Sequence, residues 1–128
     1  MENELSVVMK DRKTNVLKEK SYAFALRTIK AFQYLVAEHK EYVLSKQLLR
    51  AGTSIGANVE EANQAESKSD FIHKLAIANK EAFETHYWLR LLRDSGILTM
   101  KQAESLLNEC DELQRLLIAA IKTTRARQ

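Results

Sequence analysis

The chain has 128 residues, of which 20 are basic and 17 acidic, giving a net charge of +3, and it contains no proline, three glycines and one cysteine. This length suits a single domain, and the scarcity of proline and glycine excludes collagen-like and low-complexity chains and disfavours an all-β sandwich. Cys110 is the single cysteine, so it cannot form an intrachain disulfide. No apolar stretch approaches the ~20 residues that span a bilayer. The N-terminus lacks the basic segment followed by an apolar segment that is typical of a signal peptide. These features predict a soluble, cytoplasmic protein without membrane contact.

The first segment, residues 1–20, mixes charges with scattered valines and leucines and shows no sustained period. It is predicted to be a loosely ordered N-terminal arm, with residues 16–20 as the part most able to dock. A helix is predicted over residues 21–40, with Ser21 as its N-cap. Apolar side chains at 3-4-3-4 spacing define its expected buried face, Tyr22, Ala25, Ile29, Phe32 and Val36, which Phe24, Ala31 and Leu35 widen.

Three more helices are predicted, over residues 46–66, 69–94 and 100–124, with residues 126–128 as a frayed tail. Ser45 is the expected cap of the first of these, Gly96 ends the second, and Thr99 with Gln102 forms a capping box before the third. Phe83, Tyr87 and Trp88 are expected to broaden the apolar side of the helix over 69–94. Four helices with short connections predict an all-α protein, an antiparallel up-down-up-down four-helix bundle over residues 21–125.

The sequence offers no cofactor or metal site, and no catalytic residue. No glutamate is followed three residues later by histidine, as a di-iron bundle requires, and one cysteine does not suit zinc. Cys110 could be imagined beside His86 as a nucleophile, but it lies within a leucine repeat, where burial raises the thiol pKa. The sequence therefore predicts a protein that is not an enzyme, with Cys110 as a small core residue.

Gly52 and Gly56 stand one turn apart inside the predicted helix over residues 46–66. Each glycine costs about 1 kcal/mol of helix stability relative to alanine. A helix with two such costs in one turn is expected to pack closely against a neighbouring helix there.

A polar stripe runs along the same helix at 3-4-4-3 spacing. Its amide, guanidinium and hydroxyl groups favour directed hydrogen bonds. One interpretation is a partly exposed helix flank, another is a hydrogen-bonded network between helices or subunits, and a less favoured third is a ligand pocket. The stripe comprises Gln47, Arg50, Ser54, Asn58 and Glu61, and Glu81 and Glu84 are the expected partners of Arg50.

Basic residues accumulate toward the C-terminus, where no acid follows Glu112. They either complement helix dipoles or contact the phosphates of a nucleic acid, summed over the subunits of an oligomer. In an up-down bundle, Arg90 and Arg93 are expected at the pole opposite the C-terminal tail. The predicted nucleic-acid contacts are Arg27, Lys30, Arg90, Arg93, Arg115, Lys122, Arg125 and Arg127.

The segment Gln47–Leu92 contains a Gln-x-x-Arg-x-x-x-Ser-Ile-x-x-Asn pattern, and over about residues 21–121 the chain resembles the bacterial family of ribosomal RNA intervening-sequence proteins. Accessory variability proteins of diversity-generating retroelements belong to the same group. The resemblance implies a four-helix bundle that assembles into a homopentamer, which in the retroelement branch is basic and binds nucleic acid and a reverse transcriptase. Many members continue with Glu-Gly, whereas here Val59 precedes Glu60 and Glu61, as in a variant branch.

Charge pattern and resemblance together predict a non-enzymatic, oligomeric adaptor that binds RNA or DNA. The alternative is a structural self-assembly or protein-interaction module that does not bind nucleic acid. An enzyme that uses the polar stripe as its pocket is the third hypothesis, which no acid–base pair or nucleophile supports.

Overall fold

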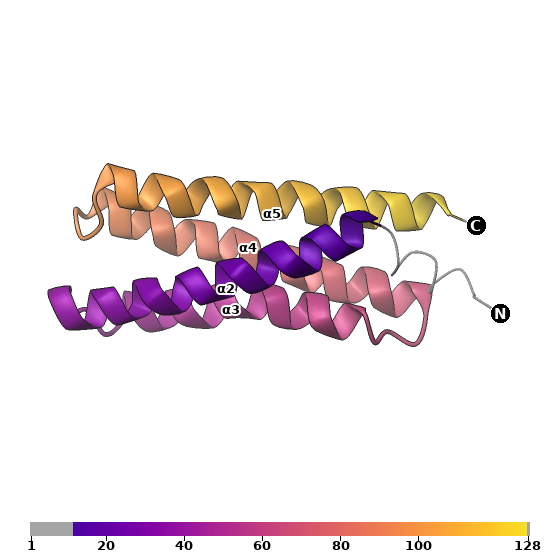
Figure 1. Ribbon diagram of the computed structural model, residues 1–128, viewed down its shortest axis with the longest axis horizontal. Coiled ribbons are helices and arrows are strands. Elements are labelled where there is room, and N and C mark those ends of the chain that lie inside the picture. Colours follow the sequence, from indigo (N-terminus) through magenta and orange to yellow (C-terminus); the bar gives the residue numbers. More distant parts are fainter. Residues whose placement is uncertain (1–11, 128) are drawn as a thin grey trace.

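The computed structural model describes the backbone of residues 12–127 and the side chains of residues 16–127, so the predictions for residues 1–11 and 128 lie outside it. This part of the chain forms four antiparallel helices in an up-down-up-down bundle, as predicted (Figure 1). Consecutive helices pack on one another, and α5 closes the bundle with a lighter contact against α2. The helices are α2 (Arg12–His39), α3 (Leu44–Ala62), α4 (Lys68–Asp94) and α5 (Met100–Ala126).

Helix α2 begins nine residues before the predicted start, so the expected arm is wrong for residues 12–20. Nothing in this segment stops a helix, and Leu17 is fully buried in the core. Ser21 is therefore not an N-cap: it lies inside the helix, buried, and its hydroxyl donates to the Lys18 carbonyl at 3.2 Å. At the other end of the chain, α5 includes Ala126, which the predicted frayed tail had contained.

The buried face of α2 also differs from the prediction. Tyr22 is 63% exposed and Ile29 is 38% exposed, although both were expected in the core. Phe24 and Leu35, which were expected to widen that face, are buried, and Ser21 and Thr28 are buried beside them. Helix α2 is thus rotated so that two small polar residues, rather than the most apolar stripe, face inward.

Close packing between α2 and α3 explains this rotation. A Cβ atom added to Gly52 would lie 2.6 Å from Thr28 Cγ2, and one added to Gly56 would lie 3.2 Å from the carbonyl oxygen of Ser21. The prediction that the two glycines admit a neighbouring helix is confirmed. Only small residues on both helices allow the two backbones to approach this closely.

The helix ends follow capping chemistry. Thr99 and Gln102 form the predicted capping box, and Gly96 takes the left-handed conformation after α4, with φ of 80°. Ser67 caps α4 by accepting the Asp70 backbone N–H at 3.0 Å, so the helix begins at Lys68, one residue before the predicted start. The expected cap at Ser45 is wrong: Val43 precedes α3, and the Glu41 carboxylate accepts the Ser45 backbone N–H at 2.7 Å.

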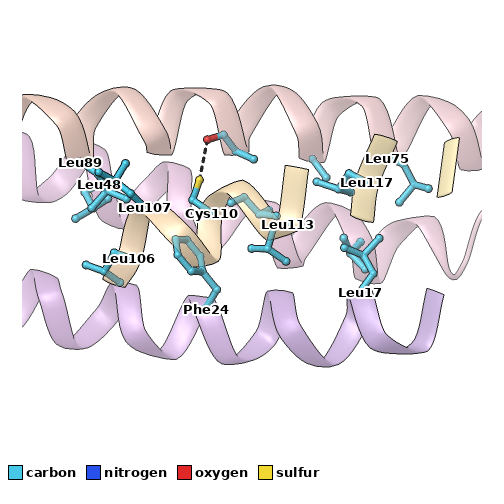
Figure 2. Packing of buried hydrophobic residues seen from close by; sticks show 14 of the residues in the cluster. Leu17, Phe24, Leu48, Leu75, Leu89, Leu106, Leu107, Cys110, Leu113 and Leu117 are labelled. Carbon is cyan, nitrogen blue, oxygen red and sulfur yellow. Dashed lines mark hydrogen bonds between the residues drawn. The ribbon is translucent and has the colours of Figure 1, made fainter. Parts of the chain in front are cut away.

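The core is filled mainly by leucine, with several alanines among its buried residues. Figure 2 shows leucine side chains gathered between the helices around Phe24 and Cys110. Cys110 lies within the core, fully buried, and its thiol donates to the Ala82 carbonyl of α4 at 3.2 Å. Burial raises the pKa of the Cys110 thiol to about 12. A thiol with this pKa is not a thiolate at neutral pH, so Cys110 acts as a core residue rather than a nucleophile.

Candidate functional site

The polar stripe of α3 faces α4, where Arg50 bridges two carboxylates one turn apart. Its guanidinium donates to Glu81 Oε2 at 3.2 Å and to Glu84 Oε1, and the Trp88 indole N–H donates to the same Glu84 oxygen at 3.2 Å. The expected pairing of Arg50 with Glu81 and Glu84 is thus present. It forms a polar clamp between α3 and α4.

The rest of the stripe makes local contacts. The Ser54 hydroxyl donates to the Arg50 carbonyl at 2.5 Å, and the Asn58 amide donates to the Ser54 carbonyl at 2.8 Å. Glu61 pairs with Lys74 of α4 at 3.0 Å, while Gln47 is exposed. Two members of the stripe therefore link α3 to α4 within one chain, and a contact between subunits stays a prediction.

The clamp makes stability depend on pH. Hydrogen bonds from Arg50 and Trp88 hold the pKa of Glu84 below its ordinary value of 4.5. Glu84 therefore contributes fully to stability above about pH 4.5, and the contribution is lost as the pH falls through the lowered pKa.

The free energy of unfolding of wild type should fall between pH 6 and pH 3 as Glu84 is protonated. In Glu84→Gln this fall should be smaller, by up to about 1 kcal/mol, which is the scale of partly exposed ion pairs. Urea unfolding at several pH values measures this change. Glu104→Gln is the matched control, because Glu104 is exposed and forms no ion pair among the residues described here. Equal pH profiles for wild type and Glu84→Gln would contradict the role of the clamp.

Several predicted nucleic-acid contacts are already paired. Arg27 forms an ion pair with Glu109 of α5 at 2.9 Å, and Arg93 pairs with Asp94 at 2.8 Å. The Arg90 guanidinium donates to His86 at 3.1 Å and lies 5.7 Å from the Tyr87 ring centroid. Acids in the same chain thus compete with phosphates for Arg27 and Arg93.

The second half of α5 is different. Arg115, Lys122 and Arg125 are exposed, and none forms an ion pair within residues 16–127. With Ile118 they recur at 3-4-3 spacing, so they share the outer face of the helix. We call Arg115, Lys122 and Arg125 the α5 basic stripe.

The eight predicted nucleic-acid contacts do not form one patch. Arg90 and Arg93 end α4 at the pole opposite the C-terminal end of α5, as expected for this topology (Figure 1). Arg127 follows α5 directly at that C-terminal end. Lys30 is exposed and lines, with Arg27, a cavity of about 300 Å³ between α2 and α5. The cations are therefore divided among separate regions of the bundle.

Two exposed apolar features were missed by the sequence analysis. On α2, Tyr22, Leu26 and Ile29 form an outward stripe, with Leu26 49% exposed. On α4, Phe83 is 59% exposed and Tyr87 is 47% exposed, although both were expected to broaden the buried side. One indication of exposed apolar residues was present in the sequence: these two helices carry more apolar positions than a single inward face accommodates.

No group of three or more metal-ligating side chains occurs in the part of the chain that the structure covers. Nor is any of the helices described here long and apolar enough to cross a membrane. The surface features that remain as candidate sites are the α3–α4 clamp, the α5 basic stripe and the exposed apolar residues.

The model of the 23S rRNA-intervening sequence protein family matches residues 13–119. The chain belongs to this family. A solved structure of a Bacteroides thetaiotaomicron protein of unknown function, from the S23 ribosomal protein family, is 55% identical to this intervening-sequence family member. The match has a TM-score of 0.85 and covers 86% of this chain and 98% of the other. None of the curated proteins matches the chain.

Proposed function

We propose that this intervening-sequence family member is a non-enzymatic, oligomeric adaptor in the cytoplasm that binds RNA or DNA through the α5 basic stripe. The observation that carries the proposal is that Arg115, Lys122 and Arg125 are exposed together without acidic partners in the described chain. Other basic side chains, such as Arg27 and Lys74, are held by carboxylates. The stripe thus gathers three exposed cations on one helix face without acidic partners among residues 16–127.

The geometry of the stripe suits a phosphate backbone. Arg115 and Arg125 are ten residues apart, which corresponds to about 15 Å along a helix at 1.5 Å per residue. Double-stranded DNA presents a negative charge about every 1.7 Å of its axis, so each cation can meet a separate phosphate. Assembly would repeat the stripe in every subunit, and the name of the matched family, 23S rRNA-intervening sequence protein, makes RNA one polyanion to test.

The direct test is binding of the purified chain, freed of contaminating nucleic acid, to structured RNA and duplex DNA. Fluorescence anisotropy at low salt should show binding of both, which weakens steeply as salt rises, because each phosphate contact releases a counterion. The absence of binding to either ligand at low salt would overturn the proposal.

The outward stripe on α2 supports the oligomeric part of the proposal, and it also favours the second candidate function, a self-assembly module that does not bind nucleic acid. Tyr22, Leu26 and Ile29 expose large apolar side chains on one face, as subunit contacts do. The family resemblance implies a homopentamer, in which each subunit contacts two neighbours through different surfaces. A reverse transcriptase or other protein partner stays a prediction.

Leu26→Glu should dissociate the assembly, because it places a charge within the apolar stripe. Sedimentation velocity at micromolar concentration measures the result, with an oligomer expected for wild type and a smaller species for the variant. Met100→Glu is the control, since Met100 is 68% exposed at the start of α5, away from the stripe. A monomeric wild type, or an unchanged assembly of Leu26→Glu, would contradict assembly through α2.

A further inference from the structure

Two aromatic rings lie exposed on the outer face of α4. Phe83 and Tyr87 are 59% and 47% exposed, and they stand four residues apart, so their side chains are neighbours on the helix surface. The neighbouring ring of Trp88 meets Tyr87 edge-on, with centroids 5.2 Å apart, and Trp88 itself packs against the core. The two exposed rings are thus attached to a rigid helix.

Cations border this aromatic pair. Lys80 lies one turn before Phe83 on the helix and is exposed, and the Arg90 guanidinium lies 5.7 Å from the Tyr87 ring centroid. Proteins that bind single strands combine aromatic rings, on which bases stack, with cations that contact the phosphates, and both kinds of group occur here.

The packing of α4 on α5 brings the α5 basic stripe near the pair. The thiol of Cys110 bonds the Ala82 carbonyl at 3.2 Å, and His86 pairs with Asp111 at 3.1 Å. These contacts place residues 82–86 of α4 beside residues 110–111 of α5, about one helical turn from Arg115. Asp111, the acid on this side of α5, is already engaged by His86.

We propose that Phe83 and Tyr87 stack on unpaired bases of a nucleic-acid strand whose phosphates lie on Arg90 and the α5 basic stripe. This inference rests on the proposed nucleic-acid binding and specifies that single-stranded segments are preferred. Every base offers a π-face to an aromatic ring, whereas the bases of a duplex are already stacked on one another. The cationic border favours a polyanion over a second copy of this positively charged chain.

The test compares wild type with Phe83→Ala/Tyr87→Ala on a single-stranded pyrimidine 12-mer, as RNA and as DNA, and on a duplex of equal length. The double variant should lose about 10- to 100-fold in affinity for the single strands, the scale of removing one or two stacked bases, and less than about twofold for the duplex. Both side chains are about half exposed and lie outside the core cluster, so the fold should persist, which circular dichroism checks. Tyr42→Ala removes a ring of similar exposure from the α2–α3 connection and is the control.

A second variant, Phe83→Trp/Tyr87→Trp, keeps two stacking rings. It should retain single-strand affinity, and its tryptophan fluorescence should be quenched when the 12-mer binds. Unchanged single-strand affinity of the alanine variant, or equal losses on both ligands, overturns the stacking inference alone. A changed sedimentation coefficient with unchanged binding also overturns it and assigns the pair to a subunit contact. If wild type binds neither ligand, the proposed function itself fails.

Discussion

Gly52→Ala is expected to destabilise the bundle by about 1–2 kcal/mol, although alanine is the better helix former. The new Cβ would lie 2.6 Å from Thr28 Cγ2, 2.7 Å from Thr28 Oγ1 and 3.1 Å from Thr28 Cβ. Thr28 is 1% exposed and its hydroxyl donates to the Phe24 carbonyl at 2.9 Å, so it cannot rotate away without losing that bond. The two helices must separate instead, and the cost exceeds the gain of about 1 kcal/mol in helix propensity.

A double-mutant cycle identifies the cause. Thr28→Ala removes the two closest atoms, so Gly52→Ala added to that background should be close to neutral in urea unfolding. Asn108→Ala, on the exposed face of α5, is the control for helix propensity. Equal costs of Gly52→Ala in both backgrounds would show that Thr28 is not the obstacle and would contradict the packing account of α2 and α3.

Neutralising the α5 basic stripe with Arg115→Gln, Lys122→Gln and Arg125→Gln should weaken binding to structured RNA about 100-fold or more at 50 mM salt. The three side chains are exposed and unpaired within the described chain, so stability should change by no more than about 0.5 kcal/mol. Fluorescence anisotropy measures the affinity. The effect should be similar for different sequences, because phosphate contacts do not read bases.

The matched control removes the same charge elsewhere. Lys40, Lys46 and Lys101 are exposed near the opposite pole, and no ion pair holds them among residues 16–127. Changing all three to glutamine should weaken binding much less than the α5 variant does. Equal losses would mean that overall charge, rather than the stripe, governs the interaction.

Much of the fold follows from local signals. The Thr99–Gln102 capping box and Gly96 mark real helix ends, and Gly52 with Gly56 correctly indicated a close helix contact. Each signal lies within a few residues, so one sequence suffices to recognise it. The family pattern around Arg50 likewise coincides with a real clamp between α3 and α4.

The inward face of α2 could not be predicted in the same way. Two overlapping stripes share that helix, and the more apolar one is only partly buried, with Tyr22 and Ile29 exposed. Ser21 and Thr28 face inward because Gly52 and Gly56 of another helix require small partners. Hydrophobic periodicity predicts the buried face from apolar content alone. It carries no information about how much room a neighbouring helix leaves for each side chain.

Which of the predicted cations are paired with acids also depends on tertiary contacts. Arg27 and Glu109 are far apart in sequence, so their ion pair is invisible until the helices are placed. The same packing left Arg115, Lys122 and Arg125 without acidic partners among the residues described. The eight cations predicted as nucleic-acid contacts therefore include some, such as Arg27, that a carboxylate already neutralises, and the role of the other cations stays a prediction.

The salt dependence of RNA binding tests the proposed function most directly. The dissociation constant of wild type and of the α5 triple variant is measured between 50 and 300 mM salt, and its logarithm is plotted against the logarithm of salt concentration. If the stripe contacts phosphates, the slope of the variant should be smaller by roughly 2–3, since each lost contact reduces it by about 0.7–0.9. Parallel lines for the two proteins would show that Arg115, Lys122 and Arg125 contact no phosphate and would contradict the account.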